Sequence, residues 1–170
     1  EAMLFNPTVR DEIAYGPRQL GLADAEDRAE RWAAALGLAP LLDAQPFSLS
    51  GGQKQKVALA AILALEPRLL LLDEPASSLD PRASGWLVDH LLDCGRTVVT
   101  STHNLSMAAE LGERAIVLGE GGRLLYDGPL QEALRDRALL EAANLVHRHR
   151  HRHDGIEHVH THSHDWESSR

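Results

Sequence analysis

Two glycines follow a serine at the start of an apolar segment, and this arrangement suits the binding of an anion. Ser50 is followed three residues later by Gln53, which predicts a capping box and a helix that begins at Gly51. The free N–H groups and positive dipole end of such a helix attract phosphate, and glycine lets a phosphate approach the backbone closely. We therefore expect Ser50, Gly51, Gly52 and Gln53 to form an anion site.

Two adjacent carboxylates follow the next apolar run. Residues 69–72 are four consecutive leucines without alternation, which predicts a strand that is buried on both faces in a parallel sheet. Asp73 and Glu74 then lie at the carboxyl end of this strand, where open α/β sheets bind their ligands. One carboxylate can hold Mg²⁺ while the other acts as a base on water. The simpler alternative is an acid pair that is solvated in a loop.

A histidine follows the next predicted strand. Residues 97–100 are rich in β-branched side chains, and His103 comes shortly after them. Because the carboxyl ends of parallel strands meet at one edge of a sheet, we expect His103 beside Asp73 and Glu74. Taken alone, a histidine in such a place is more often a structural residue.

Four motifs in this order resemble those of ABC-type ATPases. They are LSGGQ at 49–53, LLLLDEP at 69–75, SSLD at 77–80 and TSTHN at 100–104, which look like the signature, Walker B, D-loop and switch histidine. The resemblance covers about residues 5–129. The segment NPTVRDEIAYGPRQLGL at 6–22 is most similar to the ATPase subunits of cobalt and nickel importers of the energy-coupling-factor type.

The resemblance implies an α/β fold, namely the C-terminal part of a RecA-like ABC ATPase domain with a parallel sheet, a helical subdomain and a C-terminal β-hairpin. In this family two ATPase subunits pair head to tail and sandwich ATP and Mg²⁺ between them. The resemblance also implies a transmembrane partner subunit and a cytoplasmic location at the inner face of the membrane.

The resemblance further implies a role for each motif residue. The γ-phosphate of the partner's nucleotide would be held by Ser50, Gly51, Gly52 and Gln53. Asp73 would order the Mg²⁺ shell and Glu74 would be the general base. His103 would clamp the γ-phosphate, and Asp80 would couple the two sites of the dimer.

The sequence contains no phosphate loop of the form G-x-x-x-x-G-K followed by Ser or Thr. Its only lysines are Lys54 and Lys56, and no glycine directly precedes either one. The chain also begins with Glu1. We therefore expect it to be the C-terminal part of a longer polypeptide, without the nucleotide-binding front half, and to be inactive as an ATPase by itself.

Composition narrows the possible functions. The 170 residues can form one core, and a net charge of −8 argues against a nucleic-acid surface. A single cysteine, Cys94, excludes an internal disulfide and fits a reducing compartment. The longest uncharged apolar run, 57–65, is too short to span a bilayer, so we expect any membrane link to come through a partner.

We expect two regions. Residues 1–146 should form one partial ABC ATPase domain, as the resemblance implies, with a mainly helical subdomain that carries the signature at about 1–67 and the second half of the core at 68–146. Residues 147–170 should form a disordered, histidine-rich tail. Within them we expect a loop-like start with a short helix at 9–15, a hairpin of 115–118 with 123–126, and a last helix at 130–145. Asp80 before Pro81 and Asn104 should each begin a helix.

The tail holds every histidine except His90 and His103, mostly at alternate positions. Neutral imidazole is a good ligand for Ni²⁺, Co²⁺, Zn²⁺ and Cu²⁺. Arginines alternate with the first four histidines and repel a cation, so we expect the tighter site at His158, His160, His162 and His164. An inert polar tail and an expression tag are the alternatives.

The function predicted from these features is the ATP-hydrolysing subunit of a transporter that takes up cobalt or nickel. Two other classes stay open. One is a non-catalytic protein that binds metal through its tail, and the other is an ABC-type ATPase of DNA repair or translation, which the acidic charge disfavours.

Overall fold

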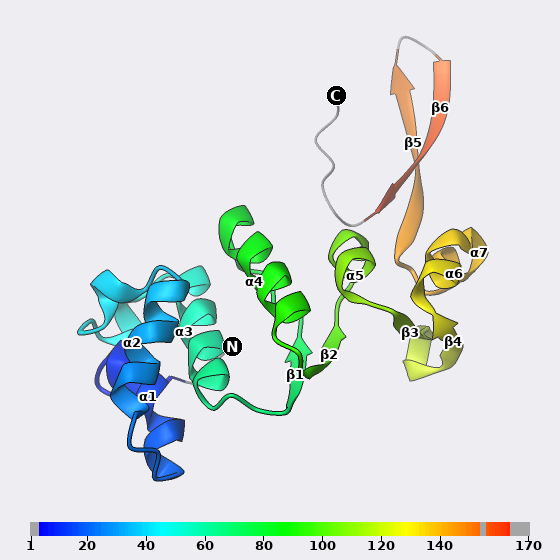
Figure 1. Cartoon of the computed structure of the whole chain (residues 1–170). Helices are drawn as coiled ribbons and strands as arrows, with labels where there is room; N and C mark the ends of the chain where they lie inside the picture. Colours follow the sequence, from blue (N-terminus) through cyan, green and yellow to red (C-terminus); the bar gives the residue numbers. More distant parts are fainter. Residues whose placement is uncertain (1–3, 154–155, 164–170) are drawn as a thin grey trace. The chain divides into compact units, whose positions relative to one another are not determined.

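The computed structural model describes residues 4–153 and 156–163, with side chains from 4 to 146 (Figure 1). The chain divides into two compact units, Glu1–Thr100 and Ser101–Arg170. No helix in the part that the structure describes is long and apolar enough to cross a membrane.

The first unit begins with three helices that pack on one another: α1 (Val9–Gln19), α2 (Ala25–Ala35) and α3 (Gly51–Ala64). Two short 3₁₀ helices, Ala39–Leu41 and Pro46–Ser48, lie between α2 and α3. The core of this bundle is formed by fully buried apolar side chains from each helix. They include Val9, Ile13, Ala14, Ala29, Ala33, Val57 and Ala60.

Helix α1 is longer than the sequence predicted. A helix at 9–15 was expected, whereas α1 runs through Gly16 and Pro17 to Gln19. Proline cannot donate a backbone hydrogen bond and normally ends a helix. Here one apolar face outweighs that cost, because α1 packs against both α2 and α3. That buried face comprises Val9, Ile13, Ala14 and Pro17.

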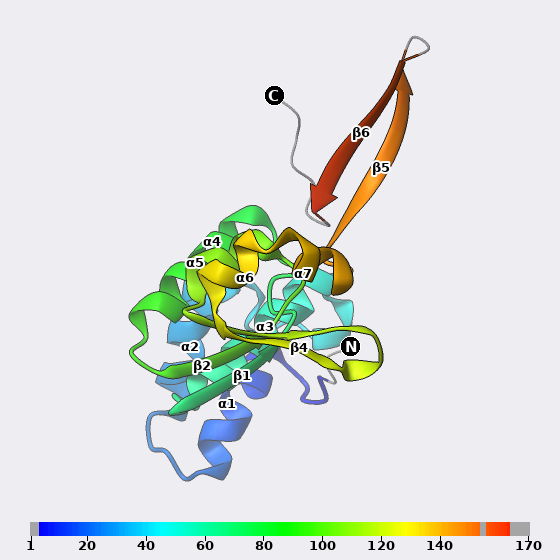
Figure 2. The same cartoon turned by 90° about the vertical axis from the view of Figure 1, so that its right-hand side faces the viewer.

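A strand–helix–strand unit follows: β1 (Leu69–Asp73), α4 (Pro81–Asp93) and β2 (Thr97–Ser101). The two strands are neighbours in one parallel sheet, which confirms the predicted fold class (Figure 2). Asp80 accepts a hydrogen bond from the N–H group of Ala83 at 2.9 Å, so it caps α4 as predicted.

The prediction that β1 is buried on both faces was wrong. Leu70 and Leu72 are 1% and 8% exposed, but Leu69 and Leu71 are 49% and 67% exposed. On β2, Val99 is also exposed. Side chains alternate between the two faces of a strand, so only one face of this sheet is covered in the described chain.

The second unit contains α5 (Leu105–Leu111) and a hairpin of β3 (Arg114–Leu118) with β4 (Leu124–Pro129). The strands pair antiparallel, which confirms the predicted hairpin. A 3₁₀ turn, Glu120–Gly122, joins them. Its last two residues have φ angles of 68° and 74°, a left-handed conformation that glycine adopts without strain.

The single helix predicted at 130–145 is instead two short helices, α6 (Leu130–Arg135) and α7 (Arg137–Ala142). The break falls at Asp136, whose carboxylate accepts a hydrogen bond from the N–H group of Leu139 at 3.0 Å. Aspartate competes with helix continuation in this way, because its short side chain can satisfy the free N–H groups of a helix start.

The tail, for which the sequence predicted disorder, contains two strands where the structure describes it. Strand β5 (Val146–His153) pairs antiparallel with β6 (Ile156–Ser163). A hairpin needs no apolar core to satisfy its backbone, because the two strands exchange their hydrogen bonds. The sequence Asp154-Gly155 between the strands is a pair that favours two-residue hairpin connections. Residues 154–155 and 164–170 lie outside the described chain, and His164 is among them.

Candidate functional site

The start of α3 has the predicted capping box. The N–H group of Gln53 donates to Ser50 Oγ at 3.3 Å, and the N–H group of Ser50 donates to Gln53 Oε1 at 2.9 Å. Ser50 and Gly51 are exposed. The positive end of the 14-residue helix is therefore open to an anionic group.

The same end of α3 is held against the loop that follows β1. A Cβ atom on Gly52 would lie 2.7 Å from the carbonyl oxygen of Ser78, so only glycine fits this contact. One turn further along the helix, Lys56 Nζ lies 2.6 Å from Asp80 Oδ2. Hydrogen bonds from Lys56 and from the Ala83 N–H group lower the pKa of the Asp80 carboxyl. The signature and D-loop segments thus form one packed cluster within the first unit.

Asp73 and Glu74 lie at the carboxyl end of β1, as the sequence predicted. Asp73 is the exposed last residue of the strand, and Glu74 is half-buried. Glu74 has a φ angle of +43°, which is unusual for a residue with a side chain. Its carbonyl accepts a hydrogen bond from the N–H group of Ser77 at 3.2 Å and so closes a turn. Backbone strain of this kind is concentrated at functional sites.

His103 belongs to the second unit, in the segment between β2 and α5. It is exposed, and hydrogen bonds on both sides fix its backbone. Thr102 Oγ1 accepts from the Asn104 N–H group at 3.0 Å, and Asn104 Oδ1 accepts from the Met107 N–H group at 2.6 Å. Asn104 therefore begins α5 as predicted and holds His103 at a defined turn.

These residues fit a nucleotide and Mg²⁺. Mg²⁺ in phosphate-transfer sites is commonly bound through one or two carboxylates together with the phosphates, and the exposed Asp73 suits this role. In the part of the chain with described side chains, no group of three or more His, Cys, Asp or Glu residues could hold a metal ion. The tail residues proposed as metal ligands lie outside that part.

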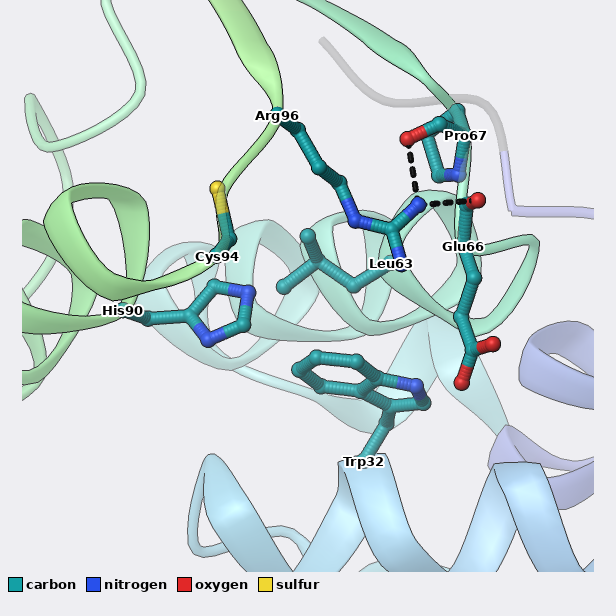
Figure 3. Close-up of a pocket in the computed structure, with 7 residues that line it drawn as sticks. All are labelled: Trp32, Leu63, Glu66, Pro67, His90, Cys94 and Arg96. Carbon is teal, nitrogen blue, oxygen red and sulfur yellow. Dashed lines mark hydrogen bonds between the residues drawn. The ribbon is translucent and has the colours of Figure 1, made fainter.

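A separate pocket in the first unit contains none of the predicted site residues (Figure 3). His90 stacks on Trp86 with centroids 5.2 Å apart and meets Trp32 edge-on at 5.0 Å. Arg96 donates to the carbonyl oxygens of Glu66 and Pro67 and ties β2 to the end of α3. Burial, together with the charge of Arg96, lowers the pKa of His90. The pocket is best explained as structural packing around these rings.

Sequence reasoning missed two positioning residues. Glu12 is 7% exposed, and its Oε2 accepts hydrogen bonds from Phe5 N at 3.0 Å and from Asn6 N at 2.7 Å, which anchors the start of the chain on α1. The sequence analysis considered Lys56 only as a lysine that no glycine precedes, although it links α3 to Asp80. Neither role has a local sequence signal, because each depends on a partner that only the fold brings close.

A strand–helix–strand unit with carboxylates at a strand end, together with an exposed glycine-rich helix start, is typical of the class of nucleotide-binding α/β proteins. Within that class the chain is similar to the ATP-binding proteins of ABC transporters. A family model described as ABC transporter matches residues 2–77.

Curated relatives agree with this assignment. The chain is 42% identical over 151 residues to the energy-coupling factor transporter ATP-binding protein EcfA2 of Mycoplasmopsis synoviae, covering 85% of this chain and 48% of that protein. It is 42% identical over 154 residues to the nickel import ATP-binding protein NikO of Rhodobacter capsulatus, covering 86% and 60%. The chain thus spans about half the length of the curated relatives it matches.

A solved structure has the same fold. The structure of cbiO1 from Clostridium perfringens, part of the ABC transporter complex cbiONQ, matches with a TM-score of 0.65 and 28% identity. The match covers 84% of this chain and 59% of that chain.

Proposed function

We propose that the chain forms part of an ATP-hydrolysing subunit that energises uptake of a transition metal. Nickel and cobalt are the first candidates for that metal. The observation that carries the proposal is the cluster at the start of α3. There Gly52 packs against the Ser78 carbonyl, and Lys56 pairs with Asp80. This cluster keeps an exposed, glycine-rich helix start in a fixed position beside the loop that follows the strand-end carboxylates.

In this proposal each group has one task. The N–H groups at Gly51 and Gly52 bind the γ-phosphate of a nucleotide on a partner subunit. The capping box of Ser50 and Gln53 fixes the conformation of the helix start. Mg²⁺, held near Asp73, would neutralise charge on the phosphates. Glu74 accepts a proton from the attacking water.

The same proposal gives roles to two further residues. His103 contacts the γ-phosphate from its fixed turn before α5. Asp80, tied to Lys56, transmits the state of one nucleotide site to the other across a head-to-tail pair. This arrangement needs a second ATPase subunit and a transmembrane subunit, with the ATPases bound peripherally at the inner face of the membrane.

The metal specificity rests on similarity to the nickel import ATP-binding protein NikO, together with the resemblance of the segment at 6–22 to cobalt and nickel importers. Co-expression with a transmembrane subunit should test it. We expect the subunit to be recovered with the chain on membranes and to support ATP-dependent nickel or cobalt accumulation. Accumulation of neither metal would leave an ABC-type ATPase with another cargo.

A Glu74→Gln variant tests the proposed chemistry. The chain would be joined behind a phosphate-loop half taken from a relative, and phosphate release would be measured with Mg²⁺. We expect the variant to lose about 10²–10⁴-fold in rate, the usual effect of losing a general base, while still binding nucleotide.

Glu120→Gln is the matched control, because Glu120 is an exposed glutamate in the β3–β4 turn. Its rate should equal that of the parent. Full activity in the Glu74→Gln protein, or an equal loss in both variants, would contradict the proposed role of Glu74.

A further inference from the structure

The register of the tail hairpin places histidines opposite histidines. In the β5–β6 pair, three consecutive alternate positions of one strand face three of the other. The pairs are His147 with His162, His149 with His160, and His151 with His158. The sequence alone suggested two separate clusters, whereas the hairpin brings residues of both to the same positions along the ladder.

The two faces of this hairpin differ in composition. Alternate residues of a strand share a face, and residues directly opposite in an antiparallel pair share it too. All six paired histidines therefore belong to one face. The arginines fall on the other face, where Arg148, Arg150 and Arg152 are opposite Thr161, Val159 and Glu157. The arginines that alternate with the β5 histidines therefore give no reason to expect weaker metal binding in β5 than in β6.

We propose that the histidine face of β5–β6 binds a divalent transition-metal ion, Ni²⁺, Co²⁺, Zn²⁺ or Cu²⁺, with ligands from both strands. Opposite residues have Cβ atoms about 4.5–5.5 Å apart, and the next pair on the same face lies about 7 Å along the strands. Zinc sites commonly have four ligands, and two neighbouring pairs contain four histidines. The central pair, His149 and His160, belongs to every such set.

The site has a structural consequence. An isolated two-stranded hairpin is marginally stable in water. An ion bound by both strands stabilises the paired state relative to the unpaired state by mass action. We therefore expect metal binding to raise the stability of the hairpin. This site is independent of the proposed ATPase function, because its ligands are all in β5 and β6.

Calorimetric titration of the 170-residue chain with Ni²⁺ or Zn²⁺ at pH 7.5 tests the proposal. One variant replaces the β5 histidines (His147→Ala, His149→Ala, His151→Ala) and a second replaces their partners (His158→Ala, His160→Ala, His162→Ala). A shared site predicts that each variant alone binds at least about tenfold more weakly, because removing either strand's residues removes half of the ligands.

The matched control changes one pair on the opposite face, Arg148→Ala with Thr161→Ala. We expect its affinity to stay within about twofold of the parent, as surface changes away from a site have small effects. If the β5 variant binds metal as tightly as the parent and only the β6 variant loses affinity, the shared site is wrong. The ligands would then be the histidines of the linear site at 158–164. Undetectable binding by the parent chain, or unchanged binding in both variants, would also overturn the shared site.

Discussion

The two glycines at the start of α3 meet different surroundings, although they are adjacent in sequence. A Cβ atom on Gly51 would meet nothing within 4 Å, whereas one on Gly52 would lie 2.7 Å from the Ser78 carbonyl oxygen. Gly51 is thus not required for packing, and Gly52 is. A functional requirement for glycine at position 51 would have to come from a ligand.

This difference predicts opposite effects on stability. Gly51→Ala should leave the free energy of unfolding unchanged or raise it by up to about 1 kcal/mol, because alanine restricts the unfolded chain. Gly52→Ala should lower it by about 1–3 kcal/mol, the usual cost of overpacking. Urea denaturation of the 170-residue chain measures both values. Equal destabilisation by the two substitutions would show that the contact with Ser78 is not tight.

His90 should make stability depend on pH. Its pKa in the folded chain is lowered by burial and by Arg96, and the opposing effect of Asp93 is smaller. Glu66 and Cys94 also line this pocket. Below the unfolded pKa of about 6.5 the unfolded chain therefore binds more protons at this residue. The contribution of His90 to the free energy of unfolding is complete above that pH. It is lost as the pH falls from about 6.5 towards the lower pKa of the folded chain.

Unfolding at pH 7.5 and 5.5 tests this, with a His90→Phe variant that keeps a ring beside Trp86. We expect the parent to lose more stability than the variant between the two pH values. The tail histidines are the same in both proteins, so their contribution cancels. The same loss in both would mean that His90 titrates alike in the folded and unfolded chain.

At the scale of elements, β1 offers a sharp test of which sheet face is covered. Leu70→Ala should cost about 2–5 kcal/mol, the range for leucines in a packed core, because Leu70 is 1% exposed. Leu71→Ala should stay within about 0.5 kcal/mol, since Leu71 is 67% exposed. Both substitutions remove the same atoms from neighbouring positions. Similar costs would show that the second face is covered as well.

Helix starts were predictable because their signals are local. Ser50 with Gln53, Asp80 with Pro81, and Asn104 each bond a backbone group within three residues of themselves. The strand-end position of Asp73 and Glu74 followed in the same way from a short apolar run. These are also the residues of the candidate site, so its motifs could be placed before the fold was known.

Features that depend on distant partners were not predictable. Helix α1 passes Pro17 because α2 and α3 cover its apolar face, and nothing within 9–19 shows that cover. Four leucines at 69–72 suggest burial on both sides, but burial depends on what lies over each face.

At the scale of the whole molecule, the candidate residues belong to two compact units. The anion site, the strand-end carboxylates and Asp80 belong to the first, and His103 belongs to the second. Each unit fixes its own residues by short local bonds: the capping box in one, and the Thr102–Asn104 turn in the other. Local rigidity of this kind suits residues that bind a ligand, because little further ordering is then needed on binding.

The 170-residue chain by itself should show no Mg²⁺-dependent ATPase activity. It has no phosphate loop, and Lys56, one of its two lysines, is paired with Asp80 at 2.6 Å. An exposed helix end contributes only about 0.3–1 kcal/mol towards a phosphate, far short of the roughly 4 kcal/mol that millimolar binding requires. Phosphate release with and without Mg²⁺, in parallel with Glu74→Gln protein, measures this. Turnover that requires Mg²⁺ and disappears in the Glu74→Gln protein would show that the chain completes a catalytic site on its own.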